Sequence, residues 1–164
     1  MQINKLGEIK NVYPSSIREN SFAKKYYNLK YEVNTYDPYN FVEDYANCEK
    51  LVHLYYREVL GKFLPINFRS KEIWESVEDE FEDISLESVK VGDILVCSRR
   101  IKKDGTIKIL DFPHMSVVSN LTGSGVEVIH TNNVEGVTVS PVSLFFKRYP
   151  KEFCKIKRPK ENIF

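Results

Sequence analysis

The sequence predicts an α+β fold in which helices come first and an antiparallel sheet of about five to six strands follows. Apolar residues recur at helical spacing in residues 48–60 and again in residues 70–82. After Gly92 the apolar period falls to two and β-branched residues become frequent, which is typical of strands. Helices that precede a run of sequential strands indicate an α+β order.

The size and charge of the chain favour one ordinary globular domain. It has 164 residues, and 24 Lys and Arg side chains balance 23 Asp and Glu side chains. A net charge of +1 lacks the positive field on which nonspecific nucleic-acid binding depends. Residues 1–20 carry no secretory signal pattern, and no apolar run is long enough to span a membrane. We therefore expect a soluble protein made in the cytoplasm, with neither nucleic-acid binding nor membrane insertion.

The two ends of the chain are predicted to lie outside the main fold. Residues 1–35 are polar and aromatic, and we interpret them as an irregular N-terminal arm that contains at most a short strand. Residues 159–164 are interpreted as a C-terminal tail. The basic run KIKRPK in residues 155–160 carries too little charge to be more than part of a tail.

Two helices are predicted before Gly92. Asn47 is a good N-cap and Gly61 a good stop, so the first helix should run for about 13 residues from Cys48. Ser70 can cap a second helix that continues to residue 82 with its acidic side chains in water. The apolar stripe of this second helix is Ile73, Trp74, Val77 and Phe81.

The strands are predicted to be sequential neighbours. Alternating residues place them at 93–101, 106–110, 114–120, 125–130 and 136–139. Asp104 and Gly105 form a hairpin signal between the first two. Ser140 and Pro141 indicate the start of a short helix at 142–146, and residues 152–157 could add a last strand.

The cysteines and histidines contain no metal-site pattern. Cys48, Cys97 and Cys154 are separated by 49 and 57 residues, which fits neither a disulfide framework nor a close zinc-ligand pair. We therefore interpret each as a single thiol. No H-E-x-x-H motif and no glycine-rich phosphate loop occurs, so no metal and no cofactor is expected.

Cys48 is the candidate nucleophile because it lies in the first turn of a predicted helix. Unpaired backbone N–H groups and the positive end of the helix dipole stabilise an anion at this position. A thiol in such a setting can lose its proton at a lowered pKa, and the thiolate is the attacking form. The alternative is that Cys48 belongs to the apolar stripe of Leu51, Val52 and Tyr55 and is only buried there.

His114 and His130 are the candidate base and its orienting partner. His114 opens the run HMSVV and His130 closes the run VEVIH, so antiparallel pairing of these strands can bring the two rings into contact. One imidazole could then accept the thiol proton while the other holds the first in position. The alternative is two ordinary polar residues at strand ends. His53 points away from the thiol and is interpreted as a surface or partner-facing residue, and Asp93 as a turn residue.

Four segments resemble the NlpC-type cysteine peptidases, and most of all the branch found in tailed-phage tail assembly proteins. The segment NCEKLVHLYYREVLGKFLP is similar to the helix that carries the family's nucleophile. The segment VKVGDILVC is similar to its Gly-Asp strand, HMSVVSN to its base-carrying strand, and VIH to the position of its third polar residue. The resemblance covers about residues 36–158, in the family's order.

The resemblance implies a papain-like fold in which the helix that bears the nucleophile packs on the antiparallel sheet. It implies Cys48 as nucleophile, His114 as general base and His130 as the residue that orients the base. Tyr36 corresponds to a tyrosine that helps to bind the oxyanion, with Tyr39 and Tyr45 as rivals. Asn47 is assigned, together with Tyr36, to the part of the site that binds the oxyanion and the substrate. The family's usual reaction is hydrolysis of amide bonds in peptidoglycan stem peptides.

The residues around Cys48 depart from the family pattern, which keeps other functions open. The family has Asp before its cysteine and small residues after it, whereas this chain has Asn47, Glu49 and Lys50. Glu49 opposes formation of a thiolate, and Lys50 offsets it only partly through solvent. A structural component of a phage tail tip, which contacts other tail proteins in the virion, is therefore the main alternative. An acyltransferase or amidase of related fold is a third reading.

Overall fold

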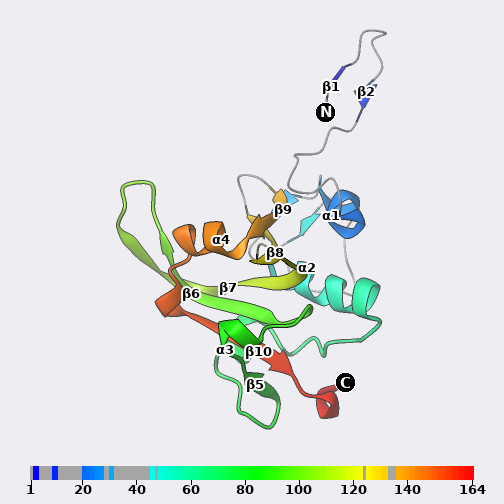
Figure 1. Ribbon diagram of the computed structural model, residues 1–164, viewed down its shortest axis with the longest axis vertical. Coiled ribbons are helices and arrows are strands. Elements are labelled where there is room, and N and C mark those ends of the chain that lie inside the picture. Colours follow the sequence, from blue (N-terminus) through cyan, green and yellow to red (C-terminus); the bar gives the residue numbers. More distant parts are fainter. Residues whose placement is uncertain are drawn as a thin grey trace.

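A computed structural model describes most of the chain from residue 48 onward and short segments before it. The described residues are 2–3, 9–10, 20–27, 30–31, 45–46, 48–123, 125–132 and 136–164. The fold is α+β, as the sequence predicts, and its main element is a six-stranded antiparallel sheet (Figure 1).

The strand order of this sheet is β5-β10-β6-β7-β8-β9. Its strands are β5 (Phe81–Asp83), β6 (Ile94–Ile101), β7 (Ile107–Thr122), β8 (Gly125–Asn132), β9 (Gly136–Pro141) and β10 (Cys154–Pro159). The predicted sequential order is confirmed for β6 to β9. The last strand, β10, returns to pair with β6 and separates it from β5.

Helices and smaller elements complete the structure. The helices are α1 (Ser21–Tyr26), α2 (Cys48–Tyr55), the π-helix η2 (Tyr56–Leu60), α3 (Ser70–Trp74) and α4 (Val142–Arg148). Short 3-10 turns are η3 (Leu86–Ser88), η4 (Lys151–Phe153) and η5 (Glu161–Ile163). Two further pairs of strands are β1 (Gln2–Ile3) with β2 (Ile9–Lys10), and β3 (Lys30–Tyr31) with β4 (Tyr45–Ala46).

Alternate residues of the central strands pack into two different apolar layers. Met115 and Val117 of β7 lie in one buried cluster with α2, while Val118 lies in a second cluster with Phe145 and Tyr149 at the end of α4. Because successive side chains of a strand point to opposite faces, α2 and α4 cover opposite faces of the sheet. β7 is thus buried on both faces over residues 113–118.

The first helical segment agrees closely with its prediction. α2 and η2 together run from Cys48 to Leu60, and Gly61 ends them with a left-handed φ of 67°. The Tyr56 hydroxyl donates a hydrogen bond to the Gly92 carbonyl, which joins this helix to the turn before β6. Gly92 has a φ of 97°, and an added Cβ would meet a Leu60 methyl at 3.0 Å, so glycine is required there.

The predicted second helix is wrong beyond its first turn. α3 ends at Trp74, and the Ser76 hydroxyl donates to the Ile73 carbonyl at 2.6 Å just after it. Val77 is 58% exposed, whereas Phe81 is fully buried at the start of β5 and packs edge-on against Phe68. Pairing of β5 with β10 buries the Phe81 ring, whereas a helix with its acidic face in water would bury less of it. Ser70 is also inside α3, and the N-cap is Arg69.

The two strands predicted at 106–110 and 114–120 are one strand, β7. The register with β6 shifts between Cys97, which faces His114, and Arg99, which faces Ile109. Residues 110–113 of β7 therefore lie opposite a single residue of β6, Ser98, and form a bulge. Pro113 is tolerated there because a bulge does not require its missing N–H in the ladder.

Cys97 and Cys154 form a disulfide, so the interpretation of three single thiols is wrong for these two. They occupy directly paired positions of β6 and β10, with Cα atoms 4.1 Å apart. The return of β10 beside β6 places them together, and spacing of 57 residues along the chain gave no signal of it. Cys48 is the free cysteine.

Both chain ends contribute more to the domain than predicted. α1 lies inside the predicted irregular arm, and its Phe22 packs edge-on against Tyr55 of α2 in the main core. The run KIKRPK is not a tail, because Lys157 pairs with Asp83 at 2.7 Å within the sheet. At the C-terminus, Phe164 stacks on Tyr56 with ring centroids 6.0 Å apart.

The remaining predictions agree with the structure within a few residues. The strands expected at 93–101, 125–130 and 136–139 correspond to β6, β8 and β9, and the expected short helix to α4. Asp93 is a turn residue as predicted, because its carboxylate accepts the backbone N–H of Lys90 at 2.8 Å. It also binds Arg158 of β10 at 2.7 Å, which fixes the entry to β6.

We expect Phe81→Ala to lower the free energy of unfolding by about 3 to 5 kcal/mol, because it leaves a cavity where a fully buried ring was. Phe112→Ala is the matched control: its ring is 51% exposed, so the change should stay within about 0.5 kcal/mol. Urea denaturation measures both. Equal effects of the two substitutions would contradict the position of β5 in the core.

Candidate active site

Cys48 is the first residue of α2 and is 7% exposed. It lies in the buried cluster with Leu51 and Val52, as its helical spacing indicates. The backbone N–H of Met115 on β7 and those at the start of α2 hydrogen-bond the sulfur and favour the thiolate. Burial outweighs them and, with the Glu49 carboxylate, raises the pKa of the Cys48 thiol to about 12. The resting form is therefore the neutral thiol.

Glu49 is a buried carboxylate with partners of its own. The Arg69 guanidinium donates to it at 2.7 Å and the Ser70 hydroxyl at 3.1 Å. These bonds tie the start of α2 to α3. Lys50 is 1% exposed, so the expectation that it acts on the thiol through solvent is wrong.

His114 and His130 are in direct contact, as the strand pattern predicts. Nε2 of His114 and Nδ1 of His130 are 3.0 Å apart, which is a hydrogen bond between the two rings. Both residues are 5% exposed. His114 belongs to β7 and His130 to the neighbouring β8, so the sheet itself brings them together.

Two aromatic residues of the α4 region hold the imidazoles, and the sequence analysis missed both. The Tyr149 ring lies parallel to the His114 ring, with centroids 4.3 Å apart and an angle of 5°. Phe145 meets the His130 ring nearly at right angles, at 5.1 Å. Phe145 and Tyr149 are four residues apart at the end of a helix, and this spacing is the signal that could have indicated one shared face.

Burial keeps both imidazoles neutral. It lowers the pKa of His130 to about 3, with a smaller contribution from the Arg148 guanidinium. It lowers the pKa of His114 well below 6.5, and the neighbouring His130, Arg148 and Arg100 act in the same direction. Each imidazole therefore has one N–H and one lone pair at neutral pH, which is the form that can accept a proton.

Cys48 approaches the histidine pair through β7. The N–H that reaches the thiol belongs to Met115, the residue after His114. The thiol also acts on Tyr149: burial raises the pKa of this phenol to about 12, and a thiolate at Cys48 opposes its ionisation further. Within the described part of the chain, no hydrogen bond joins the sulfur to an imidazole. The three predicted residues thus share one region, and only the two histidines are in hydrogen-bond contact.

The predicted oxyanion residues cannot be placed. Tyr36, its rival Tyr39 and Asn47 lie outside the described residues. The second rival, Tyr45, belongs to β4, but its side chain is outside them as well.

His53 is not the surface residue that its position predicted. It is 2% exposed, with Nδ1 3.1 Å from the Leu64 carbonyl and Nε2 2.8 Å from the Phe68 carbonyl. Burial lowers its pKa to about 4 although both carbonyls favour the protonated ring. His53 therefore holds the loop between η2 and α3, whose return over α2 the helical spacing could not indicate.

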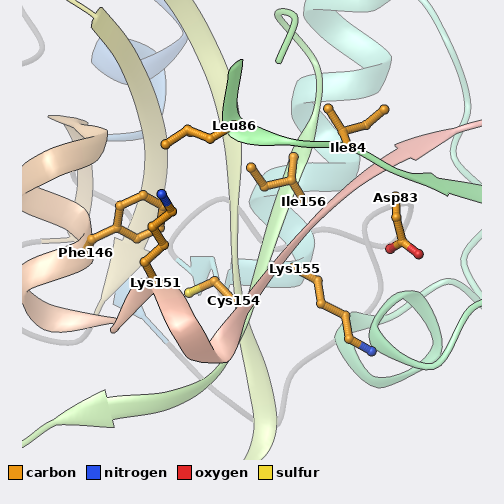
Figure 2. A pocket seen from close by; sticks show the side chains of 8 residues that line it. All are labelled: Asp83, Ile84, Leu86, Phe146, Lys151, Cys154, Lys155 and Ile156. Carbon is orange, nitrogen blue, oxygen red and sulfur yellow. The ribbon is translucent and has the colours of Figure 1, made fainter. Parts of the chain in front are cut away.

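A pocket of about 270 Å³ is lined by residues of β5, β10 and the segments next to them (Figure 2). Neither His114 nor Cys48 lines it, so it is not the cleft of the candidate site. Its wall includes Cys154 of the disulfide. The lining residues are Asp83, Ile84, Leu86, Phe146, Lys151, Cys154, Lys155 and Ile156.

The described segments contain no group of three His, Cys, Asp or Glu side chains that could hold a metal ion. In the same residues no helix combines the length and apolar character needed to cross a membrane. Comparison with known proteins finds no matching family model and no matching curated protein.

We expect the free energy of unfolding to fall as the pH drops from about 7 to about 5. The folded-state pKa is about 4 for His53, about 3 for His130 and lowered for His114, against 6.5 when unfolded. The unfolded chain therefore binds more protons below pH 6.5, and each histidine should cost roughly 1 kcal/mol per pH unit. Urea denaturation at several pH values measures this slope.

His130→Gln should reduce the slope of the free energy of unfolding against pH by the contribution of one histidine. The same series of urea denaturations tests it. A free energy of unfolding that stays constant over this pH range would show that the three rings are not buried in the neutral form.

Proposed function

We propose that the protein is a cysteine peptidase with a papain-like, NlpC-type domain, in which Cys48 attacks and His114 and His130 move and hold the proton. The observation that carries this proposal is the 3.0 Å contact between Nε2 of His114 and Nδ1 of His130, on the strand that also donates an N–H to the Cys48 thiol. A nucleophile, a base and a residue that orients the base are the three parts that acyl transfer needs.

The contact between the rings determines which atoms can act. Nε2 of His114 is occupied by His130, so Nδ1 is the nitrogen left to accept the thiol proton. Nδ1 must then carry the lone pair, and Nε2–H of His114 donates to Nδ1 of His130. Parallel stacking on Tyr149 holds the His114 plane in the orientation that this bond requires.

The proposed reaction starts from a neutral thiol and a neutral imidazole. Nδ1 of His114 takes the proton as the sulfur bonds to the amide carbon, and the carbonyl oxygen becomes an oxyanion. Backbone N–H groups at the start of α2 stabilise this oxyanion. The imidazolium returns its proton to the leaving amine as the C–N bond breaks. Water then attacks the thioester, with His114 again as the base, and releases the acid and the thiol.

The substrate proposal rests on the resemblance to the NlpC-type peptidases. The segment NCEKLVHLYYREVLGKFLP and the runs HMSVVSN and VIH support peptidoglycan stem peptides as the amide substrate. They also support assembly into a phage tail, with other tail tip proteins as partners and the virion as the location.

We expect Cys48→Ala to abolish release of amines from purified stem peptides, because the acyl-enzyme cannot form. His114→Ala should lower kcat by a factor of about 10² to 10⁴, the usual contribution of a general base. Mass spectrometry of the products measures both. Circular dichroism must show an unchanged fold. Cleavage by Cys48→Ala at the wild-type rate would rule out the proposed nucleophile.

A specific observation favours a second function, a catalytically silent structural component of a tail tip. The Cys48 thiol is buried and its pKa is raised to about 12, with Glu49 acting in the same direction. An active thiol is normally ionised more easily than this. In this alternative the domain serves only to contact other proteins.

Alkylation of Cys48 distinguishes the two functions. If the imidazole takes the thiol proton, the wild-type rate with iodoacetamide should change little from about pH 7 to about pH 10, because the thiol and the imidazole both stay neutral over this range. A rate that rises about tenfold per pH unit would indicate reaction through the free thiolate alone. We expect His114→Ala to slow this reaction at least about tenfold, since the base that takes the proton is lost. Cys48→Ser is the control for labelling at other sites. Identical rates with and without the imidazole would favour the structural function.

A further inference from the structure

A two-stranded arm extends from the sheet beyond the disulfide (Figure 1). We define the arm as residues 98–112, which follow the last pair between β6 and β10 at Cys97. Its strands pair from Arg99 with Ile109 to Ile101 with Ile107. In the described residues no third strand pairs with 98–112, since β8 joins β7 only from Val117 onward. Both edges of the arm therefore offer backbone groups for pairing.

The arm is both apolar and basic. Ile107, Ile109 and Phe112 are 49%, 65% and 51% exposed, which is unusual for large apolar side chains grouped on one short element. Five cationic side chains accompany two carboxylates, so the arm has an excess of positive charge. The cationic residues are Arg99, Arg100, Lys102, Lys103 and Lys108, and the carboxylates are Asp104 and Asp111.

An acidic segment of opposite character follows α3. We define the acidic segment as residues 75–83, which contain six carboxylates and no cationic side chain. Of these, Asp83 pairs with Lys157 of β10. Val77, in the middle of the segment, is 58% exposed. The segment therefore matches the arm in combining exposed apolar surface with charge, but its charge is negative.

The two surfaces lie at opposite ends of β6. The acidic segment ends in β5, whose Asp83 pairs with Lys157, and Lys157 faces Ile94 at the start of β6. The arm begins where β6 ends. Because the sheet lies between them, the arm and the acidic segment of one molecule do not meet.

We propose that copies of this chain associate head to tail, with the arm of one copy on the acidic segment of the next. Charge complementarity selects a second copy as the occupant. The same contact can also cover the exposed isoleucines of the arm and Val77. The two patches differ, so the interface is heterologous and repeats from copy to copy into a ring or a filament. This inference does not depend on the proposed peptidase activity.

Sedimentation velocity of the full chain tests the proposal. We expect association that grows with protein concentration at about 20 mM NaCl and weakens at least about tenfold at about 500 mM, because salt screens exposed charges. A single monomeric species at every protein and salt concentration would overturn the proposal. In that case a different anionic protein would be the occupant of the arm.

Charge reversal identifies the surfaces. We expect K103E/K108E, which changes the net charge of the arm from +3 to −1, and E75K/E78K/D79K/E82K, which changes that of the acidic segment from −6 to +2, each to be monomeric, because each interface then has like charges. All six substituted side chains are exposed, and circular dichroism checks the fold. Lys24→Glu, an exposed reversal on α1, is the control and should associate as the wild type does.

Mixing the two reversed variants is the decisive step. The reversed arm of one then matches the reversed acidic segment of the other, and the two unreversed surfaces match as they do in the wild type. An equimolar mixture should therefore restore association, with the two variants alternating along the assembly. A mixture that stays monomeric would overturn the pairing of these two surfaces, and so would wild-type association of either variant alone.

Discussion

The structure depends on the burial of one strand on both faces. From His114 to Val118, β7 sends alternate side chains into the layer under α2 and the layer under α4. This alternation places Met115 toward Cys48 and His114 toward Tyr149. A shift of one residue in the register would exchange the two sets and separate the histidine pair from its aromatic neighbours. The geometry of the candidate site thus follows from the packing of a single strand.

The same burial sets the electrostatics of the site. Burial raises the pKa of Cys48 and lowers the pKa values of His114 and His130, so the neutral form of each group is favoured. Loss of hydration is the largest cause for each. A ready-made thiolate–imidazolium pair is therefore not the resting state. In the proposed reaction the proton moves only as the sulfur attacks. Entry of a substrate changes the solvation of the site, which is what disfavours the ionised thiol and imidazole. Burial therefore stabilises the neutral groups and opposes the ionisation that the proposed reaction requires.

The errors of the sequence analysis have a common origin in contacts between distant parts of the chain. The helix expected to reach residue 82 ends at Trp74 because β10 offers Phe81 a place in the sheet. The disulfide of Cys97 with Cys154 depends on the same return of β10. His53 is buried because a following loop passes over it. Neither helical nor strand periodicity carries information about such returns.

Local pattern by itself determined the helix that begins at Cys48, its end at Gly61, most strands of the sheet and the meeting of His114 with His130. Each of these depends on residues close in the chain or on strands joined by a short turn, where period and turn chemistry suffice. Tertiary structure alone decided the depth at which Cys48 lies, the partners of Glu49, and the placement of Phe145 and Tyr149 against the imidazoles. The physical reason is that desolvation and ring packing arise from all neighbouring elements together, whereas a sequence pattern reports one element at a time.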